Sequence, residues 1–246
     1  MDRIKTLALV SATLIIIATA ITWAITRDVN MTLAILTLAS TIATVIMAVT
    51  IYELDIALKE LNFEAVSEVY GMMNRELKEN IGKIQGWHMK DLEDGKISKG
   101  KLVDAAKKEF LRDKEKTKAV SAASRVLNRV GYFVYRDFVG DWFIQEQYGG
   151  LILDSFLAMK PYLKVLRDER ECKDDEECKN ASWFLRRFYL LLVVISYHYL
   201  CKNFRKNCEK TFEKYGESPA NPVPPRWLAN DVKAWLKKKG YKKYLK

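Results

Sequence analysis

The chain has 246 residues, of which 49% are hydrophobic and 29% charged, and its formal net charge is +10. These proportions exclude a single evenly mixed domain, because the apolar residues are concentrated near the N-terminus and the charged residues follow them. Only Arg27 and Asp28 carry charge between Lys5 and Glu53. We therefore expect the first part of the chain and the remainder to lie in different surroundings.

Two uncharged stretches, residues 6–26 and 29–52, predict two transmembrane helices. At about 1.5 Å of rise per residue, each stretch is long enough to cross a hydrocarbon layer of roughly 30 Å. The polar residues between them leave room only for a reversal of the chain, which predicts a transmembrane hairpin over residues 1–52. The alternative is a signal peptide cleaved after "ATA" at residues 18–20, but the apolar run continues beyond that point.

Basic residues beside the spans predict the orientation of the hairpin. Arg3, Lys5 and Lys59 flank its outer ends, whereas Arg27 alone lies in the turn. This bias favours a multi-pass protein of the cell membrane with both termini in the cytoplasm, where the basic body would face an anionic leaflet. Two features favour the other side: the glycosylation pattern "NAS" at residues 180–182, and four cysteines, which suit an oxidising compartment.

Apolar side chains recur every three or four residues after the second span and predict a stalk helix over residues 53–84. This stripe consists of Leu54, Leu58, Leu61, Ala65, Val69, Met73, Leu77, Ile81 and Ile84. The same stripe would also suit the first helix of a globular domain, and the two interpretations are compatible.

Residues 85–215 predict a helical bundle. A polar loop and a short amphipathic helix come first, followed by helices over residues 118–139 and 141–170, the second with Pro161 inside it. A long helix is expected over residues 182–215, and its apolar centre is too short for a third span. No stretch alternates polar and apolar residues, so the predicted fold class is all-α.

The chain ends with a Pro-rich linker, residues 216–225, and a basic helix over residues 226–246. Basic amphipathic helices that carry tryptophan bind anionic membrane surfaces. The candidate contacts with a membrane surface or a partner are Trp227, Val232, Trp235, Lys237, Lys238 and Lys239. Two alternatives are docking of the tryptophan face onto the helical body and binding of nucleic acid, for which no recognisable reading motif is present.

Residues 126–171 resemble an uncharacterised prokaryotic family of membrane-anchored, all-helical proteins, a domain of unknown function. The resemblance is loose and covers about a fifth of the chain. It depends on a glycine turn, an aromatic-glycine pair, a further aromatic residue, a "PY" pair and an arginine, at Gly140, Tyr148, Gly149, Phe156, Pro161, Tyr162 and Arg167. It implies an all-helical cytoplasmic module behind one or two membrane helices, and it brings no catalytic residues.

Small and hydroxylated residues form a stripe on each predicted span, which we call the membrane seam. Its hydroxylated members are Thr19, Thr22, Thr26, Thr37, Ser40, Thr41 and Thr44. Such residues let membrane helices approach closely and form hydrogen bonds across the contact. The alternative is a pore lined by threonine in a larger ring.

The sequence contains few residues that could form a catalytic site. The only histidines are His88 and His198, and the sequence contains no glycine-rich phosphate loop, no "HExxH" and no nucleophile elbow. We therefore predict no catalytic residues, no metal and no cofactor. His198 lies in the apolar stretch "ISYHYLC", where a hydrogen-bonded core residue is commoner than a ligand.

Four cysteines, Cys172, Cys178, Cys201 and Cys208, are candidates for disulfide bonds. Their spacings do not match the tight pairs of structural zinc sites. If Cys201 and Cys208 share one continuous helix, their Cα atoms are about 10.5 Å apart along its axis, too far for a disulfide. The first two would then pair together or reach back to the long helix, and free buried thiols are the alternative.

These features predict a membrane-anchored, non-enzymatic helical protein that self-associates or binds a protein partner at the cytoplasmic membrane face. The lipid bilayer is then an obligatory partner, a homo-oligomer is expected, and nucleic acid is not. The alternative is an oligomeric pore-forming or channel-like effector in which the same hairpin assembles into a ring. A lipid-directed enzyme is a third hypothesis, which a bound metal or cofactor would favour.

Overall fold

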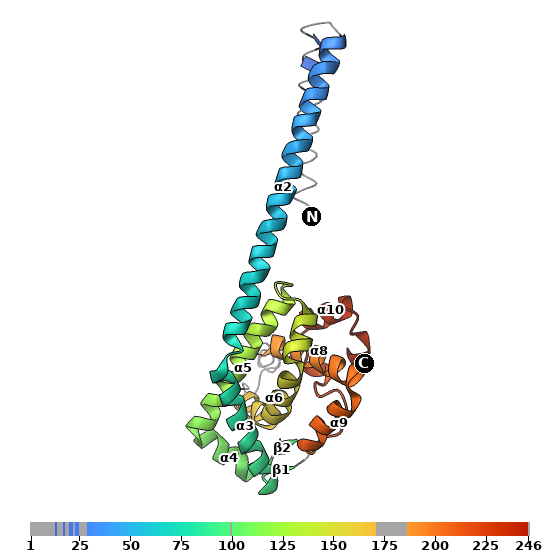
Figure 1. Cartoon of the computed structure of the whole chain (residues 1–246). Helices are drawn as coiled ribbons and strands as arrows, with labels where there is room; N and C mark the ends of the chain where they lie inside the picture. The colour runs from blue at the N-terminus through green and yellow to red at the C-terminus, as the bar shows by residue number, and fades with distance from the viewer. Residues whose placement is uncertain are drawn as a thin grey trace. The chain divides into compact units, whose positions relative to one another are not determined.

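A computed structural model describes residues 29–98, 100–170 and 186–245, together with isolated positions between residues 13 and 24. The described residues are predominantly helical, which confirms the predicted all-α class (Figure 1). They form two compact units, Met1–Leu61 and Asn62–Lys246. Most of the first predicted span, and with it the hairpin, lies outside the described residues.

The helix α2 runs from Val29 to Met72 without interruption. The second predicted span therefore continues as a helix beyond the last uncharged residue. The predicted stalk is divided, however, because α2 ends one residue after Gly71, and Asn74 begins a new helix, α3 (Arg75–Glu93), by accepting a hydrogen bond from Leu77 N at 2.9 Å. The apolar stripe persists across this break: its members from residue 65 onward, Ala65, Val69, Met73, Leu77, Ile81 and Ile84, are all buried.

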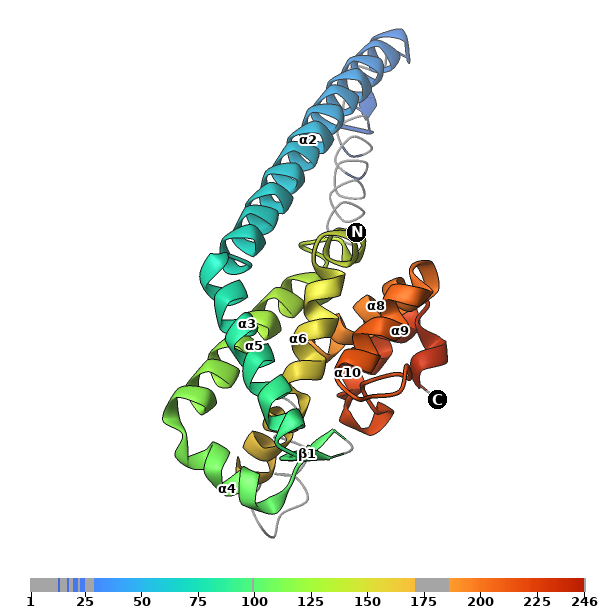
Figure 2. The same cartoon turned by 60° about the horizontal axis from the view of Figure 1, so that its bottom comes forward.

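The second unit, which we call the helical domain, is built around α8. After α3 come β1 (Ile97–Ser98), β2 (Lys101–Leu102), α4 (Asp104–Arg112), α5 (Lys114–Tyr135), α6 (Asp141–Arg170), α8 (Arg187–Asn203), α9 (Arg205–Lys214), η1 (Pro225–Trp227), α10 (Asn230–Lys238) and η2 (Lys242–Leu245). The helix α8 packs most extensively against α5 and α6, and also contacts α9 and α10 (Figure 2).

A short antiparallel hairpin occupies part of the predicted polar loop. Ile97 pairs with Leu102, and both side chains are buried. The turn requires a left-handed residue, which Gly100 supplies with a φ of +66°. A strand of two residues leaves no alternating pattern in the sequence, so periodicity gave no signal for it.

A side chain of α5 caps the N-terminus of α8. The side-chain oxygen of Asn128 accepts hydrogen bonds from the backbone N–H groups of Phe188 and Tyr189 at 3.1 and 3.3 Å. These are two of the donors that the first turn of any helix leaves unsatisfied. The two helices approach closely because of Gly131, where a Cβ atom would lie 2.1 Å from the carbonyl oxygen of Phe188.

The predicted helix over residues 182–215 is wrong as a single element. It is interrupted at Phe204, whose backbone angles of −134° and 55° are not helical. The chain therefore turns between α8 and α9, and Phe212 of α9 packs into the core with no exposed surface.

The C-terminal segment is part of the helical domain. Trp227, Val232 and Trp235 are 7%, 0% and 8% exposed, so this face packs against the helical body, whereas Lys237, Lys238 and Lys239 are exposed and their contact with a membrane or partner stays a prediction. The tryptophan face completes an apolar core that the preceding helices leave open at this place. The Pro-rich segment packs with it, since Val223 is fully buried.

Candidate functional site

One helix in the described part of the chain is long and apolar enough to cross a membrane, Leu36–Met72. None of its most apolar window is buried. Leu38, Ile46 and Ile51, for example, are 63%, 59% and 60% exposed. The core helix of a soluble protein would have a similar composition but would be covered by its neighbours. The exposed apolar surface of α2 is thus the first candidate site, and its ligand would be lipid or another apolar helix.

The seam residues that the structure describes lie on this exposed surface. The Oγ1 atoms of Thr37, Thr41 and Thr44 each donate a hydrogen bond of 2.8 Å to the backbone carbonyl four residues earlier. Their hydroxyl groups are satisfied within the helix, which makes them tolerable in hydrocarbon. Ser40 is also exposed. Thr19, Thr22 and Thr26 lie outside the described residues.

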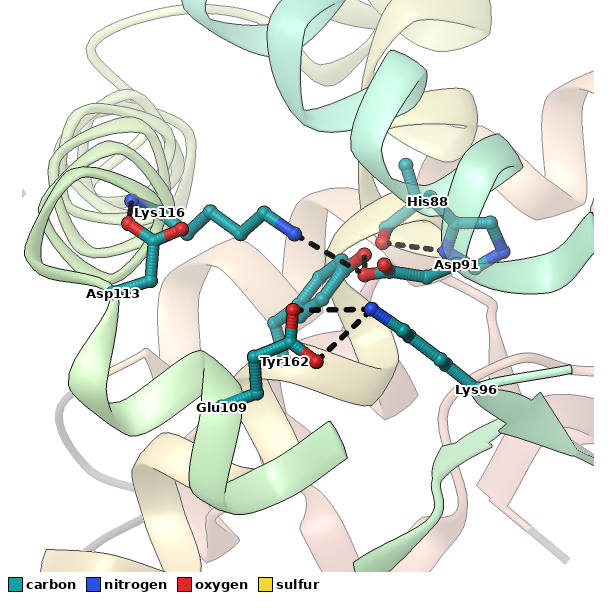
Figure 3. A network of polar contacts seen from close by, with 8 residues as sticks. His88, Asp91, Lys96, Glu109, Asp113, Lys116 and Tyr162 are labelled. Carbon is teal, nitrogen blue, oxygen red and sulfur yellow. Dashed lines mark hydrogen bonds and ion pairs between the residues drawn. The ribbon is translucent and has the colours of Figure 1, made fainter. Parts of the chain in front are cut away.

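A second candidate site is a network of polar side chains inside the helical domain (Figure 3). At its centre is Asp91 of α3, which is only 5% exposed. Its Oδ2 accepts a hydrogen bond of 2.6 Å from the hydroxyl of Tyr162 on α6, and lies 3.6 Å from Nζ of Lys116 on α5. A buried carboxylate is costly unless it has such partners. Burial and the Asp91 carboxylate raise the pKa of Tyr162, which therefore remains protonated and donates.

His88 lies one turn before Asp91 and is 1% exposed. Its Nδ1 is 2.9 Å from the carbonyl oxygen of Ala158, which requires Nδ1 to carry the proton. The ring meets the rings of Tyr162 and Tyr215 edge to face, with centroids 6.3 and 5.0 Å apart. Burial lowers the pKa of His88, although the Ala158 carbonyl opposes the shift, so the ring is neutral at pH 7.

The cavity beside Asp91 is very small. Its volume is about 10 Å³, and its polar lining is Asp91, Lys96, Glu109, Asp113 and Lys116. That is room for about one water molecule. At its exposed side Lys96 Nζ binds both carboxylate oxygens of Glu109, at 3.0 and 2.9 Å. The network therefore joins α3, α4, α5 and α6, and it leaves no space for an organic substrate.

The second histidine, His198, is half-buried on α8. Its ring meets the ring of Tyr241 at 90°, with centroids 5.1 Å apart. Burial lowers the pKa of His198, and the positive charges of Lys243 and Lys202 lower it further. Among the described residues no group of three His, Cys, Asp or Glu side chains is placed to hold a metal ion.

Two of the candidate cysteines form a disulfide bond, Cys201 with Cys208, and their Cα atoms are 5.1 Å apart. The expectation that they cannot pair is wrong, because it assumed one continuous helix. The interruption at Phe204 brings the end of α8 and the first turn of α9 together. Cys172 and Cys178 lie outside the described residues.

Sequence reasoning missed the Asp91 network, although a signal for it existed. The apolar stripe of α3 runs through Leu77, Ile81 and Ile84, and steps of four and three residues continue it to His88 and Asp91. Polar residues in register with a buried stripe are expected to be buried and paired.

Comparison of the chain with protein-family models, with curated proteins and with solved structures finds no match. The function must therefore be argued from the exposed helix and the helical domain themselves.

Proposed function

We propose that this chain is a membrane-anchored, non-enzymatic protein whose helical domain binds a protein partner, or a second copy of the chain, beside the membrane. One observation carries the proposal. The apolar, uncovered helix α2 continues without a break into residues such as Ala65 and Val69, which are buried in the core of the helical domain. An anchor built in this way holds a folded domain next to the bilayer.

The two-span hairpin is part of this proposal. The uncharged residues 6–26 supply a first span, and the described threonines of α2 supply a surface on which it can pack. The hydroxyls of Thr37 and Thr41 already bond to their own helix, so the hairpin would not depend on hydrogen bonds from them to the first span. Close packing of small side chains is then the expected source of hairpin stability.

The non-enzymatic part of the proposal is supported by the chemistry of the interior. Asp91, Tyr162 and Lys116 satisfy one another, and the cavity beside them holds about one water molecule. Side chains that bond to one another in the interior stabilise the packing of helices. They are not available for proton transfer to a substrate.

A groove supports the binding of a protein. A hollow of about 440 Å³ lies where α2 gives way to α3 and faces α5. It is lined by Met72, Leu77 and Val126, which are buried or half-buried, and by Glu68 and Glu76, which are exposed. A buried apolar centre with an exposed polar rim is the usual arrangement of a protein interface.

We place both termini in the cytoplasm on the basis of Arg3, Lys5 and Lys59. The Cys201–Cys208 disulfide is typical of an oxidising compartment, or of an intracellular protein from a hyperthermophile. A thiol-reactive polyethylene glycol that cannot cross membranes separates these arrangements. After reduction, the half-buried Cys201 should react only in cells whose membrane has been opened, and reaction in intact cells would reverse the assigned topology.

Two measurements on the full-length protein test the anchor and the assembly. The protein should remain in the membrane pellet after alkaline carbonate and float with liposomes, and the detergent-solubilised particle should have the mass of an oligomer. Release by carbonate would overturn the anchor. A monomeric particle that does not bind any protein when cross-linked in its own membrane would overturn the binding function.

The alternative, a pore, is favoured by the exposed row of Thr37, Thr41 and Thr44 on α2. Liposomes containing the purified protein would then leak ions, and replacing the three threonines with leucine would stop the leak. That result would replace the binding function with a conducting one. Intact liposomes at the same protein density would support the anchor alone.

A further inference from the structure

The end of α10 is fixed to the turn between α5 and α6. Lys239 Nζ lies 2.7 Å from Oδ1 of Asp137 in this turn. The hydroxyl of Tyr241 donates a hydrogen bond of 2.9 Å to Oδ2 of Asp141, the first residue of α6, and accepts one of 2.7 Å from Gln145. Two segments about a hundred residues apart in sequence therefore form one surface.

This surface lies at the end of the helical domain where α2 enters it. Helix α5 runs antiparallel to the nearby part of α2 and α3, because Ala122 shares a groove with Leu77 whereas Arg129 pairs with Glu68. Continuing this register toward Asn62 leads to the C-terminal end of α5 and the turn that follows. Figure 1 shows this turn and α10 at the same end of the domain.

The surface combines basic charge with an exposed tryptophan. Arg136, Lys237 and Lys238 are exposed, while Lys239 neutralises Asp137. Trp142, in the first turn of α6, is 63% exposed, although the other tryptophans of the helical domain that the structure describes are largely covered. Lysine and arginine attract anionic headgroups, and tryptophan is enriched at the level of those headgroups.

We propose that this surface, formed by Arg136, Trp142, Lys237 and Lys238, binds the anionic headgroups of the bilayer that holds α2. The inference rests on the proposed membrane anchor. The nine helical residues between Tyr52 and Asn62 form a tether of only about 15 Å, so the helical domain stays within reach of the headgroup layer. Lys237 and Lys238, which the sequence placed on an amphipathic C-terminal helix, thus belong to a surface of the helical domain. Trp142 of α6 is part of the same surface.

The test uses the full-length protein in vesicles of phosphatidylcholine alone, or with a quarter of phosphatidylserine. Amide hydrogen exchange around residues 136–142 and 237–243 should be slower in the anionic vesicles, by about fivefold for each lysine that contacts the surface. The variant Lys237→Glu/Lys238→Glu should lose this difference. The matched variant Lys101→Glu/Lys108→Glu, on exposed positions of β2 and α4, should keep it.

A second readout addresses Trp142 directly. Brominated acyl chains quench tryptophan near the hydrocarbon boundary, and Trp142→Phe should remove part of the quenching seen in anionic vesicles only. Equal exchange and equal quenching in both lipids, with the protein still floating, would overturn the inference and leave the anchor intact. Failure of the protein to float would overturn the anchor itself.

Nucleic acid is the competing polyanion, and a single-stranded oligonucleotide tests it. Protection of residues 237–243 by the oligonucleotide on neutral vesicles, without protection by phosphatidylserine, would assign the surface to nucleic acid and overturn the lipid contact. Protection by phosphatidylserine that the oligonucleotide does not reproduce supports it.

Discussion

Helices α2 and α8 have similar compositions and opposite environments. Both are apolar on nearly every face. Residues 188–196 of α8 are buried without exception, whereas the apolar residues of α2 before residue 62 are exposed or half-exposed wherever their burial is described. A helix that is apolar on every face is unfavourable in water. Its composition does not specify whether it is buried in a protein core or inserted into a lipid bilayer.

Length and flanking charge make the difference. The uncharged part of α8 ends at Lys202 and begins after Arg187, which is too short to cross a bilayer, and α5 and α6 enclose it. Residues 29–52 of α2 are long enough to cross, and no described helix covers them. The comparison teaches that similar compositions leave one helix uncovered and enclose the other in a core, and under the proposed anchor the same hydrophobic driving force accounts for both.

The strongest way to break this comparison is to place charge in α2. In a chain that begins at Met31 and so has a single span, Ile42→Lys/Ile46→Lys should abolish membrane integration. Two lysines near the centre of a span cost about 5–7 kcal/mol in insertion free energy. Carbonate extraction measures the result, and Val103→Lys, on an exposed apolar position of the helical domain, is the control that should stay in the membrane. Integration of the double variant would exclude α2 as the span.

Equal truncations in the two helices should have unequal effects. Leu192→Ala in α8 removes a side chain with no exposed surface and should lower the free energy of unfolding of the helical domain by about 2–5 kcal/mol. Leu38→Ala in α2 should leave it unchanged, since Leu38 is 63% exposed. Urea unfolding in detergent, followed by near-ultraviolet circular dichroism, compares them. Similar losses in both variants would mean that α2 is packed against the domain.

The disulfide at the end of α8 should stabilise the domain and not the anchor. Cys201→Ser/Cys208→Ser opens a loop with a sequence separation of 7 and should lower the unfolding free energy by about 2–3 kcal/mol. A thermal melt with and without reductant provides the measurement. The reductant should lower the Tm of the wild-type protein by more than that of the serine variant.

Two glycine substitutions should give the smallest changes in the free energy of unfolding, and these changes should have opposite signs. Gly131→Ala places a methyl group against the Phe188 carbonyl and should destabilise the domain by about 1–3 kcal/mol. Gly82→Ala in α3, where nothing lies within 4 Å of the new Cβ, should stabilise it by about 0.5–1 kcal/mol. If both substitutions stabilise, α5 and α8 are farther apart than described.

The sequence predicted the helical class, the bounds of α6 and the stripe from Ala65 to Ile84, because these depend on local periodicity. It predicted the apolar face of the C-terminal helix but not what covers it, since an amphipathic face has the same pattern against lipid and against a core. The Cys201–Cys208 bond was missed because the interruption at Phe204 has no glycine or proline to mark it. The polar run after Cys201 was the available signal.

The Asp91 network shows another limit of periodicity. The stripe of α3 specified that His88 and Asp91 point inward, but their partners come from other helices, Lys116 from α5 and the carbonyl of Ala158 and Tyr162 from α6. The packing of α3 against α5 and α6 brings them together. The membrane seam stays a prediction for all its residues, because packing between two spans depends on tertiary contact.

The cap that Asn128 gives to α8 has a consequence for biosynthesis. The first turn of α8 donates hydrogen bonds to Asn128, about sixty residues earlier in the chain. Helix α5 is therefore already synthesised when the apolar segment of α8 leaves the ribosome. Asn128 and Gly131 therefore let the first turn of α8 pack against a helix that has already been synthesised.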